Sequence, residues 1–250
     1  MSATITISTE RTQRAAPALH EPVLALVLYA PGGQDGLNSA YTRKHRIRHD
    51  SRGRAMLGAA QALTHEDARD LLMTLGGRAL TPTRENTLAT SPTACAWWIP
   101  AGERALLFNP KYAQAGSVAR FSGQLVPHPP LVFIAGPGSL SVYALRENTR
   151  PILDTPVCHA PFWNVFPSGQ VCRGSTAYPQ ACTPDTQPDW EEVFFQSEFT
   201  GPSRTDRHMN WGKSYEELLD TAQAQGTFPA EVLVNAGQTL GRAVALPTHD

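Results

Sequence analysis

The feature that most restricts the fold of this chain is a long segment without regular structure, residues 149–188. Prolines and glycines interrupt the segment throughout, and its hydrophobic residues follow neither the helical nor the strand period. Its aromatic residues favour packing over disorder, and they are Phe162, Trp163, Phe166 and Tyr178. Irregular segments of this length inside a domain are usually functional or disordered. The sequence therefore predicts a structured, functional loop between regular elements.

Short hydrophobic runs that end at turn residues come before the loop, and such runs are typical of strands. The first, residues 23–28, is followed by Pro31-Gly32-Gly33 and is interpreted as a buried strand. Residues 41–49 follow as a second extended segment. Four later runs predict an antiparallel meander, and they are residues 94–99, 104–108, 131–135 and 140–145.

Helical periodicity appears in three segments, residues 64–75, 188–197 and 214–224. The first begins at a capping box formed by Thr64 and Asp67, and the third at one formed by Ser214 and Glu217. A less regular amphipathic segment follows at residues 229–246, where two glycines interrupt the helical pattern.

The order of these elements predicts an α+β chain. It consists of an N-terminal strand pair, a helix, a four-stranded meander, the irregular loop and C-terminal helices. We divide the chain into a flexible tail, an N-terminal β extension, a main domain and a C-terminal helical segment with its tail; their residues are 1–20, 21–63, 64–226 and 227–250. A chain of 250 residues has room for one large domain with an appendage, but not for two independent enzymes.

The formal net charge of −1 lacks the basic excess of a general nucleic-acid binder. Basic side chains do gather in residues 43–49, but Tyr41 is the only aromatic beside them that could stack on a base. We interpret this run as a solvated strand face and keep nucleic-acid binding as the weaker alternative.

Two sequence features bear on the compartment. The longest apolar run, around residues 23–28, is far shorter than the roughly 20 residues that span a bilayer. Residues 1–16 have no apolar segment ahead of a small-residue cleavage site, so we expect no secretory signal and a cytoplasmic protein without a membrane partner. In that compartment the cysteines should be free thiols, with Cys95 in the core; they are Cys95, Cys158, Cys172 and Cys182.

Residues 162–172 read Phe-Trp-Asn-Val-Phe-Pro-Ser-Gly-Gln-Val-Cys. Without a gap, this segment resembles the active-site signature of ubiquitin-conjugating enzymes, His-Pro-Asn-[Ile/Val]-x-x-x-Gly-x-[Ile/Val]-Cys. Five diagnostic positions agree, and they are occupied by Asn164, Val165, Gly169, Val171 and Cys172. The first two positions differ, because Phe162 and Trp163 stand in place of His and Pro. The resemblance covers roughly residues 64–226, although only this segment is close.

The resemblance implies a ubiquitin-conjugating-enzyme-like fold, with helix, meander, active-site loop and C-terminal helices in that order. It also implies an activity: a ubiquitin-like protein is received as a thioester from a ThiF-like activating protein and passed to an amine. More narrowly, the chain is similar to the PRTRC system protein B family, whose plasmid cassettes also encode a JAB-type peptidase, a ParB-related protein and a small companion protein. No metal and no organic cofactor is implied.

The resemblance also assigns roles to individual residues. Cys172 would carry the modifier, and Asn164 would donate a hydrogen bond to the oxyanion that forms during transfer. Gly169 would let the backbone turn between them, and Arg173 would favour the thiolate of its neighbour. The positions that would support this loop are Val165, Gly169, Val171 and Arg173.

Residues outside the matched positions are weaker candidates. The family commonly has Leu-Asp after the cysteine, where this chain has Arg173-Gly174. An acidic residue that orients the incoming amine is expected beyond the cysteine, and Asp185 and Asp189 qualify by position, although solvated acids at a helix start are the simpler interpretation. His159 either lines the site or is an ordinary loop histidine.

Two other uses of the loop remain open. Cys158, His159, Cys172 and Cys182 could bind zinc, but the cysteines lack the closely spaced pairs of structural zinc sites. Alternatively, the chain keeps the fold without the activity and acts as a non-catalytic scaffold that binds partners of a plasmid-maintenance cassette. The absent signature His and the unusual residues after Cys172 motivate that second interpretation.

Overall fold

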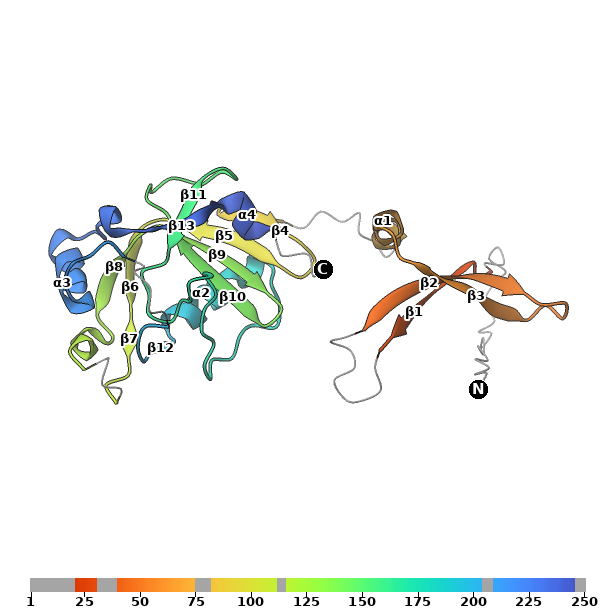
Figure 1. Ribbon diagram of the computed structural model, residues 1–250, viewed down its shortest axis with the longest axis horizontal. Helices are drawn as coiled ribbons and strands as arrows, with labels where there is room; N and C mark the ends of the chain where they lie inside the picture. The colour runs from red at the N-terminus through yellow and green to blue at the C-terminus, as the bar shows by residue number, and fades with distance from the viewer. Residues whose placement is uncertain (1–20, 31–39, 75–81, 112–115, 204–208, 246–250) are drawn as a thin grey trace. The chain divides into compact units, whose positions relative to one another are not determined.

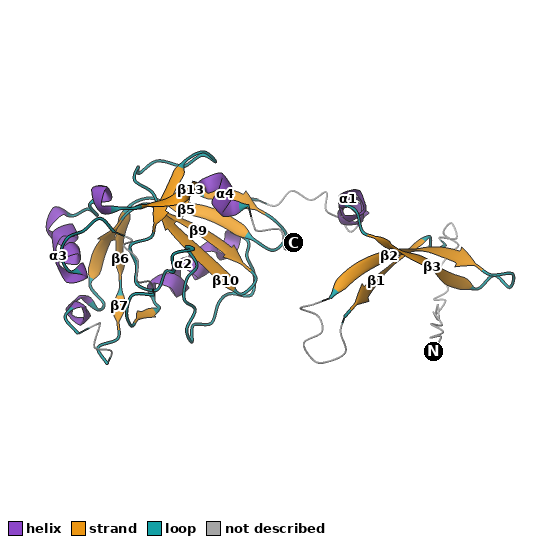
Figure 2. Cartoon of the chain, viewed as in Figure 1, coloured by secondary structure: helices purple, strands orange, loops and turns teal. Residues whose placement is uncertain are grey.

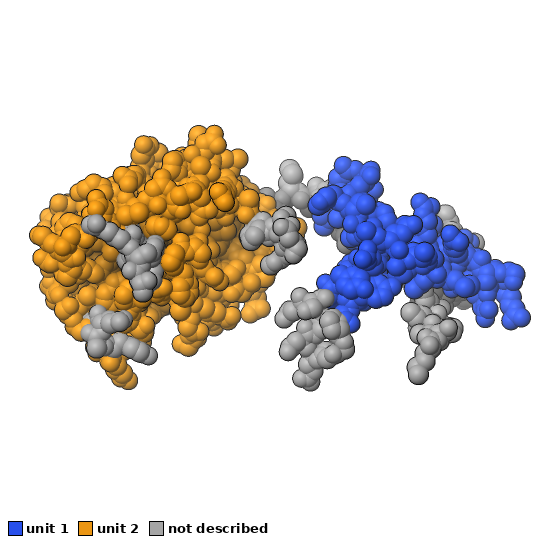
Figure 3. All heavy atoms as spheres, viewed as in Figure 1, with its two compact units in different colours: residues 1–81 blue, residues 82–250 orange. Residues whose placement is uncertain are grey.

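The computed structural model describes five stretches of the chain, residues 21–30, 40–74, 82–111, 116–203 and 209–245. The chain divides into two compact units, residues 1–81 and residues 82–250 (Figure 3). The predicted tail at residues 1–20 lies outside the described residues. None of the helices in the described stretches is long and apolar enough to cross a membrane.

The first unit contains a three-stranded antiparallel sheet, in the order β1-β2-β3, and one helix (Figure 1). Its elements are β1 (Leu24–Tyr29), β2 (Tyr41–His49), β3 (Ala55–Ala62) and α1 (His65–Thr74). The sequence predicts only the first two strands, because β3 is rich in alanine and lacks the alternation of polar and apolar residues that marks a strand. The N-terminal extension is therefore a three-stranded sheet and not a strand pair.

Strand β1 is not the buried strand that its sequence predicts. Its residues alternate between exposed and half-buried, and Leu24, Leu26 and Leu28 are on the exposed side. In the described residues of this unit, His45 alone has a buried side chain. The apolar run of β1 thus belongs to a sheet surface.

Helix α1 confirms the helix predicted after Thr64. Thr64 N donates to Asp67 Oδ2 at 2.8 Å, and Asp67 N donates to Thr64 Oγ1 at 3.2 Å, which is the predicted capping box. Asp67 also accepts a hydrogen bond from Lys44 Nζ of β2 at 2.6 Å. Helix α1 therefore contacts the N-terminal sheet and belongs to the first unit, whereas the sequence predicts that the main domain begins at residue 64.

The second unit is built on a six-stranded antiparallel sheet in the order β13-β11-β10-β9-β5-β4 (Figure 1). Its strands are β4 (Thr87–Thr90), β5 (Cys95–Ile99), β9 (Leu131–Gly136), β10 (Ser139–Ala144), β11 (Pro156–His159) and β13 (Asn235–Thr239). The predicted runs 94–99, 131–135 and 140–145 correspond to the neighbouring strands β5, β9 and β10. This part of the meander is confirmed.

The fourth predicted strand, residues 104–108, lies outside this sheet. Its residues are divided between β6 (Gly102–Ala105), which pairs antiparallel with β8 (Leu125–His128), and β7 (Leu107–Phe108), which pairs in parallel with β12 (Glu198–Phe199). The sequence does not predict β8, because Pro127 lies within it and proline is rare inside strands. The prediction that residues 104–108 form a strand of the same meander was therefore wrong.

Helices α2 (Gln187–Phe195) and α4 (Leu240–Val244) cover opposite faces of the six-stranded sheet (Figure 2). Helix α3 (Tyr215–Gln225) packs against β8 instead. Trp190 and Phe194 of α2 pack in the main core with Val142 of β10, while Leu240 of α4 packs in a smaller core with Tyr143. Because side chains alternate along β10, Val142 and Tyr143 point to opposite faces. The unit is thus a mixed α+β layered structure.

The C-terminal segment is not the helix that its amphipathic pattern predicts. After α3, which keeps its predicted capping box between Ser214 and Glu217, residues 235–239 form strand β13 beside β11. Gly237 has a φ of +74°, a left-handed conformation that suits glycine and interrupts a helix. Helix α4 contains only five residues, and residues 246–250 lie outside the described part.

His128 of β8 makes the stability of the second unit depend on pH. Its side chain is buried, Nδ1 donates to Pro129 O at 2.8 Å, and burial lowers the pKa of the imidazole from 6.5 to about 4. Between these values the unfolded chain binds a proton that the folded chain does not, so stability is present above the unfolded pKa and is lost as pH falls towards the folded one. We expect a loss of about 2 kcal/mol between pH 7 and pH 5.

Urea unfolding at both pH values measures this loss. His128→Asn retains an amide donor for Pro129 O and removes the titration, so its stability should change less with pH. Equal pH dependence in the two proteins would show that His128 is not the group responsible.

Candidate functional site

The irregular loop folds back on itself around an exposed thiol. Val165 and Val171 face each other in an isolated antiparallel bridge, and both are buried. Cys172 N donates to Asn164 O at 2.6 Å, so these two residues lie side by side. Two residues that are eight positions apart in the motif, Asn164 and Cys172, are thus neighbours in the folded loop.

Cys172 differs from the other cysteines in its exposure. All four are free thiols, but Cys95, Cys158 and Cys182 are buried, whereas Cys172 is exposed. Burial raises the pKa of each of the three buried thiols, which disfavours their thiolates. Cys172 is therefore the thiol that another protein can reach.

Main-chain hydrogen bonds attach the loop to strand β10. Val142 N donates to Gly169 O and Val171 N donates to Leu140 O, each at 2.8 Å. Gly169 has a φ of +87°, and a Cβ atom there would lie 2.3 Å from Cζ of the Tyr143 ring. Only glycine satisfies both the backbone conformation and this close approach.

Tyr143 also holds the loop through its hydroxyl group. The hydroxyl donates to Ser168 O at 2.5 Å and accepts a hydrogen bond from Gln238 Nε2 of β13 at 3.0 Å. Burial raises the pKa of Tyr143, so the hydroxyl remains protonated and able to donate. Strands β10 and β13 together fix the turn that precedes Cys172.

Two aromatic residues occupy the places of the signature His and Pro. Phe162 and Trp163 are both buried in the main core. The Phe162 ring lies edge-on to Phe194 of α2 with centroids 5.2 Å apart, and the Trp163 ring lies 5.3 Å from that of Tyr215 of α3. Aromatic packing thus anchors the start of the loop.

Asn164 is buried, and its side chain is oriented by a hydroxyl after α2. Asn164 Nδ2 donates to Ser197 Oγ at 3.0 Å, and Ser197 Oγ in turn donates to Phe194 O at 2.7 Å. The carboxamide nitrogen carries two hydrogens, and Ser197 uses one of them. Its second N–H makes no hydrogen bond within the described stretches.

Arg173 follows the thiol but is engaged along its own loop. Its Nε donates to Thr176 O at 2.9 Å, and its guanidinium lies 5.1 Å from the centre of the Tyr178 ring. Burial raises the pKa of Tyr178, the positive charge of Arg173 lowers it, and a charge on Cys172 raises it. Tyr178 therefore lies within electrostatic range of both Arg173 and Cys172.

The weaker candidates lie on other elements. His159 is half-buried on β11, opposite Tyr143. Asp185 lies in a short 3₁₀ turn and Asp189 in the first turn of α2; both are exposed and neither has a hydrogen bond or ion pair within the described residues. Over the same part of the chain, no three His, Cys, Asp or Glu side chains come together as a metal site.

Some residues of the site carry no signal in the sequence. These residues act on the loop from elsewhere along the chain: Ser197 follows α2, Tyr143 lies on β10 and Gln238 lies on β13. The alternation of β10 could have revealed that Tyr143 and Val142 face opposite sides, but not that Tyr143 meets Gly169. Contacts of this kind depend on the tertiary arrangement.

The second unit is thus a mixed α+β structure whose irregular loop presents an exposed cysteine beside an asparagine. Residues 77–236, more than half of the chain, match the model of prokaryotic E2 family D. The chain belongs to this family. The matched residues exclude α1 and the first sheet, so the match begins after residue 64, where the sequence placed the start of the resemblance, and it extends past the expected end at residue 226. Searches of curated proteins and of solved structures gave no match.

Proposed function

We propose that this chain is a conjugating enzyme that carries a ubiquitin-like protein as a thioester on Cys172. The observation that supports this most is the exposed Cys172 thiol next to Asn164, in a chain of prokaryotic E2 family D. A thiol of this kind is open both to an activating protein and to an amine acceptor. The second unit would correspond to a ubiquitin-conjugating-enzyme-like fold.

The reaction comprises two acyl transfers at one sulfur. The Cys172 thiolate attacks the C-terminal acyl group of the modifier, held on a ThiF-like activating protein, and a C–S bond forms as the activating protein's leaving group departs. An amine then attacks the thioester carbonyl and a tetrahedral oxyanion forms. Collapse of this oxyanion breaks the C–S bond, releases Cys172 as thiolate, and leaves an amide after the amine gives a proton to water.

Asn164 is proposed to stabilise the oxyanion. Ser197 holds one N–H of its carboxamide, which leaves the second N–H at a fixed orientation. Because Cys172 N bonds to Asn164 O, the two residues are neighbours, and the second N–H is proposed to reach the carbonyl oxygen of the acyl group on Cys172. A donor that is already oriented costs no reorganisation when charge develops on the carbonyl oxygen.

Asn164→Ala should slow transfer from the charged enzyme to a free amine by about a hundredfold, the size of loss seen when one oxyanion donor is removed. The measurement is single-turnover discharge of the thioester with a lysine solution. Ser197→Ala keeps the carboxamide but frees its rotation, so it should cause a smaller loss. Discharge at the wild-type rate in Asn164→Ala would remove Asn164 from the mechanism.

The partners follow from the same proposal. A ThiF-like activating protein would supply a small ubiquitin-like protein, and a JAB-type peptidase and a ParB-related protein would act in the same plasmid-type cassette. The cytoplasm, where thiols persist, is the compartment that suits this chemistry.

The direct experiment combines the purified full chain with the activating protein, the modifier and ATP. A band shift by one modifier that disappears on reduction supports the thioester. If no thiol-sensitive adduct forms while the activating protein itself becomes charged, the enzymatic proposal fails.

A scaffold without catalysis is the second candidate, and one contact favours it. Asn164 is buried and its side chain is already bonded to Ser197, as that of a purely structural asparagine would be. In that case Asn164→Ala lowers the unfolding free energy, and the wild-type chain binds the activating protein without becoming charged.

A further inference from the structure

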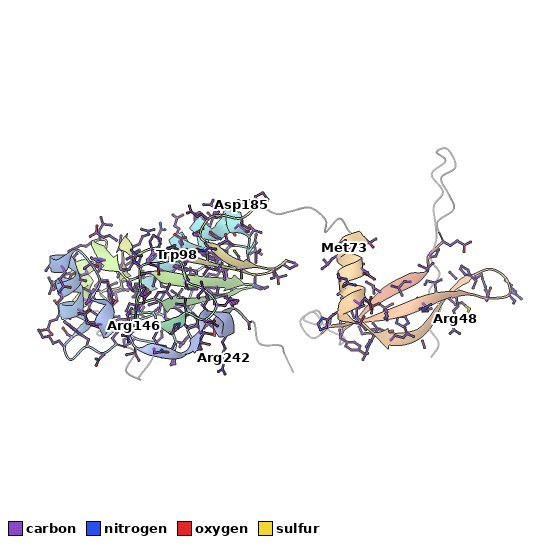
Figure 4. All side chains as sticks on the ribbon, turned by 90° about the horizontal axis from the view of Figure 1, so that it is seen from above. Arg48, Met73, Trp98, Arg146, Asp185 and Arg242 are labelled. Carbon is purple, nitrogen blue, oxygen red and sulfur yellow. The ribbon has the colours of Figure 1, made fainter. Side chains whose placement is uncertain are left out.

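The second unit also contains an open hollow of about 400 Å³, on the face of the six-stranded sheet that packs against α4. Six of its lining residues are polar: Ser139, Ser141 and Tyr143 from β10, Ser168, Gln238 from β13, and Arg242 from α4. Hollows of this size accommodate small organic molecules. Figure 4 labels Arg242 on α4.

Three donors in this hollow are unused. The hydroxyls of Ser139 and Ser141 and the guanidinium of Arg242 have no hydrogen bond or ion pair to any residue that the structure describes. In contrast, Tyr143 and Gln238 bond to each other. Among the residues that the structure describes, no Asp or Glu lines the hollow. Unused donors, one of them cationic, with no carboxylate among them, favour a ligand that is an anion and a hydrogen-bond acceptor.

The lining of the hollow favours an organic anion over a simple ion. Ser139 and Ser141 are two positions apart on one strand, which separates their Cα atoms by about 7 Å and spreads the donors along the hollow. The remaining lining is small and aliphatic: Ile134, Gly136, Ala243 and Ala245. It offers aliphatic contacts and little surface for stacking a nucleobase.

We propose that this hollow binds an aliphatic organic anion, whose charged group pairs with Arg242 and whose other acceptor atoms receive hydrogen bonds from Ser139 and Ser141. The charged group is a carboxylate or a phosphate. The hollow shares Tyr143 and Ser168 with the loop of Cys172, so the ligand lies against the side chain that holds that loop. Binding does not require modifier chemistry, and its test is independent of conjugation.

Calorimetric titration of the full chain tests the proposal with three probes. N-acetyl-dialanine presents a peptide carboxylate, propyl phosphate presents an aliphatic phosphate, and N-acetyl-dialanine amide is the uncharged match of the first. At least one anion should bind saturably, and the affinity should fall about tenfold or more in Arg242→Ala and for the amide, as expected for a lost charge-assisted hydrogen bond. The anion that binds with the higher affinity shows whether the hollow prefers a carboxylate or a phosphate.

Two further variants complete the test. Ser141→Ala should weaken binding without abolishing it, because it removes one neutral donor. Arg48→Ala removes an exposed arginine of the first unit and should leave binding unchanged. Absence of saturable binding by both anions below about 10 mM, equal binding of the amide, or unchanged affinity in Arg242→Ala would each overturn the proposal.

Discussion

A Cys172→Ser variant should form an adduct with the modifier that withstands thiols and is cleaved by hydroxylamine. The serine oxygen accepts the same acyl group, but the product is an oxyester, which thiols attack far more slowly than a thioester. Transfer from this oxyester to an amine should be almost abolished, since an alkoxide is a much poorer leaving group than the thiolate of Cys172. Gel analysis of the adduct with and without reducing agent, followed by hydroxylamine, measures both properties.

The matched control is Cys182→Ala, which removes a buried thiol of the same unit. It should leave the thiol-sensitive adduct in place, because Cys182 is not accessible to the activating protein. A thiol-sensitive adduct that persists in Cys172→Ser, but disappears in another cysteine variant, would move the acyl-carrying role away from Cys172.

Gly169→Ala should be the most damaging substitution in the loop that does not touch the nucleophile. The new Cβ would lie 2.3 Å from Cζ of Tyr143, and an L-residue at a φ of +87° is strained whatever the space. Backbone strain and overpacking each cost on the order of 1–3 kcal/mol, so the unfolding free energy of the second unit should fall by about 3 kcal/mol. Urea unfolding gives the stability, and the rate of adduct formation reports on the loop.

Gly174→Ala separates the two causes. Gly174 also has a positive φ, +52°, but a Cβ there meets nothing within 4 Å. The loss of stability in Gly174→Ala should therefore come from backbone strain alone and amount to about 1 kcal/mol. If the two variants lose the same stability, the contact between Tyr143 and Gly169 does not contribute as we infer.

The sequence was most informative where structure depends on near neighbours. Capping boxes located the starts of α1 and α3, since the cap and its partner are three residues apart. Apolar runs located β5, β9 and β10. The adjacency of Asn164 and Cys172 in the fold agrees with the turn that Gly169 was expected to allow.

The remaining features depend on partners far away in the sequence. β13 forms because β11 offers a free edge, and this outweighs the amphipathic helical pattern of its residues. The bond from Asn164 to Ser197 requires the end of α2 to pack beside the loop. For the same reason α1 could not be assigned to a unit before its ion pair with Lys44 was seen.

The attachment of the Cys172 loop to β10 has a consequence for the lifetime of the site. Val142 and Val171 commit their amide protons to bonds between loop and sheet, and β10 lies in the interior of that sheet. Releasing the loop would break both of these bonds and the Tyr143–Ser168 bond and would expose the buried Val165 and Val171, which is a cooperative event and not a local fluctuation. The fraction of molecules with a reactive Cys172 thiol should then follow the folded fraction of the whole second unit. A destabilising substitution in the distant core would therefore lower the reactivity of Cys172 as much as a substitution beside it.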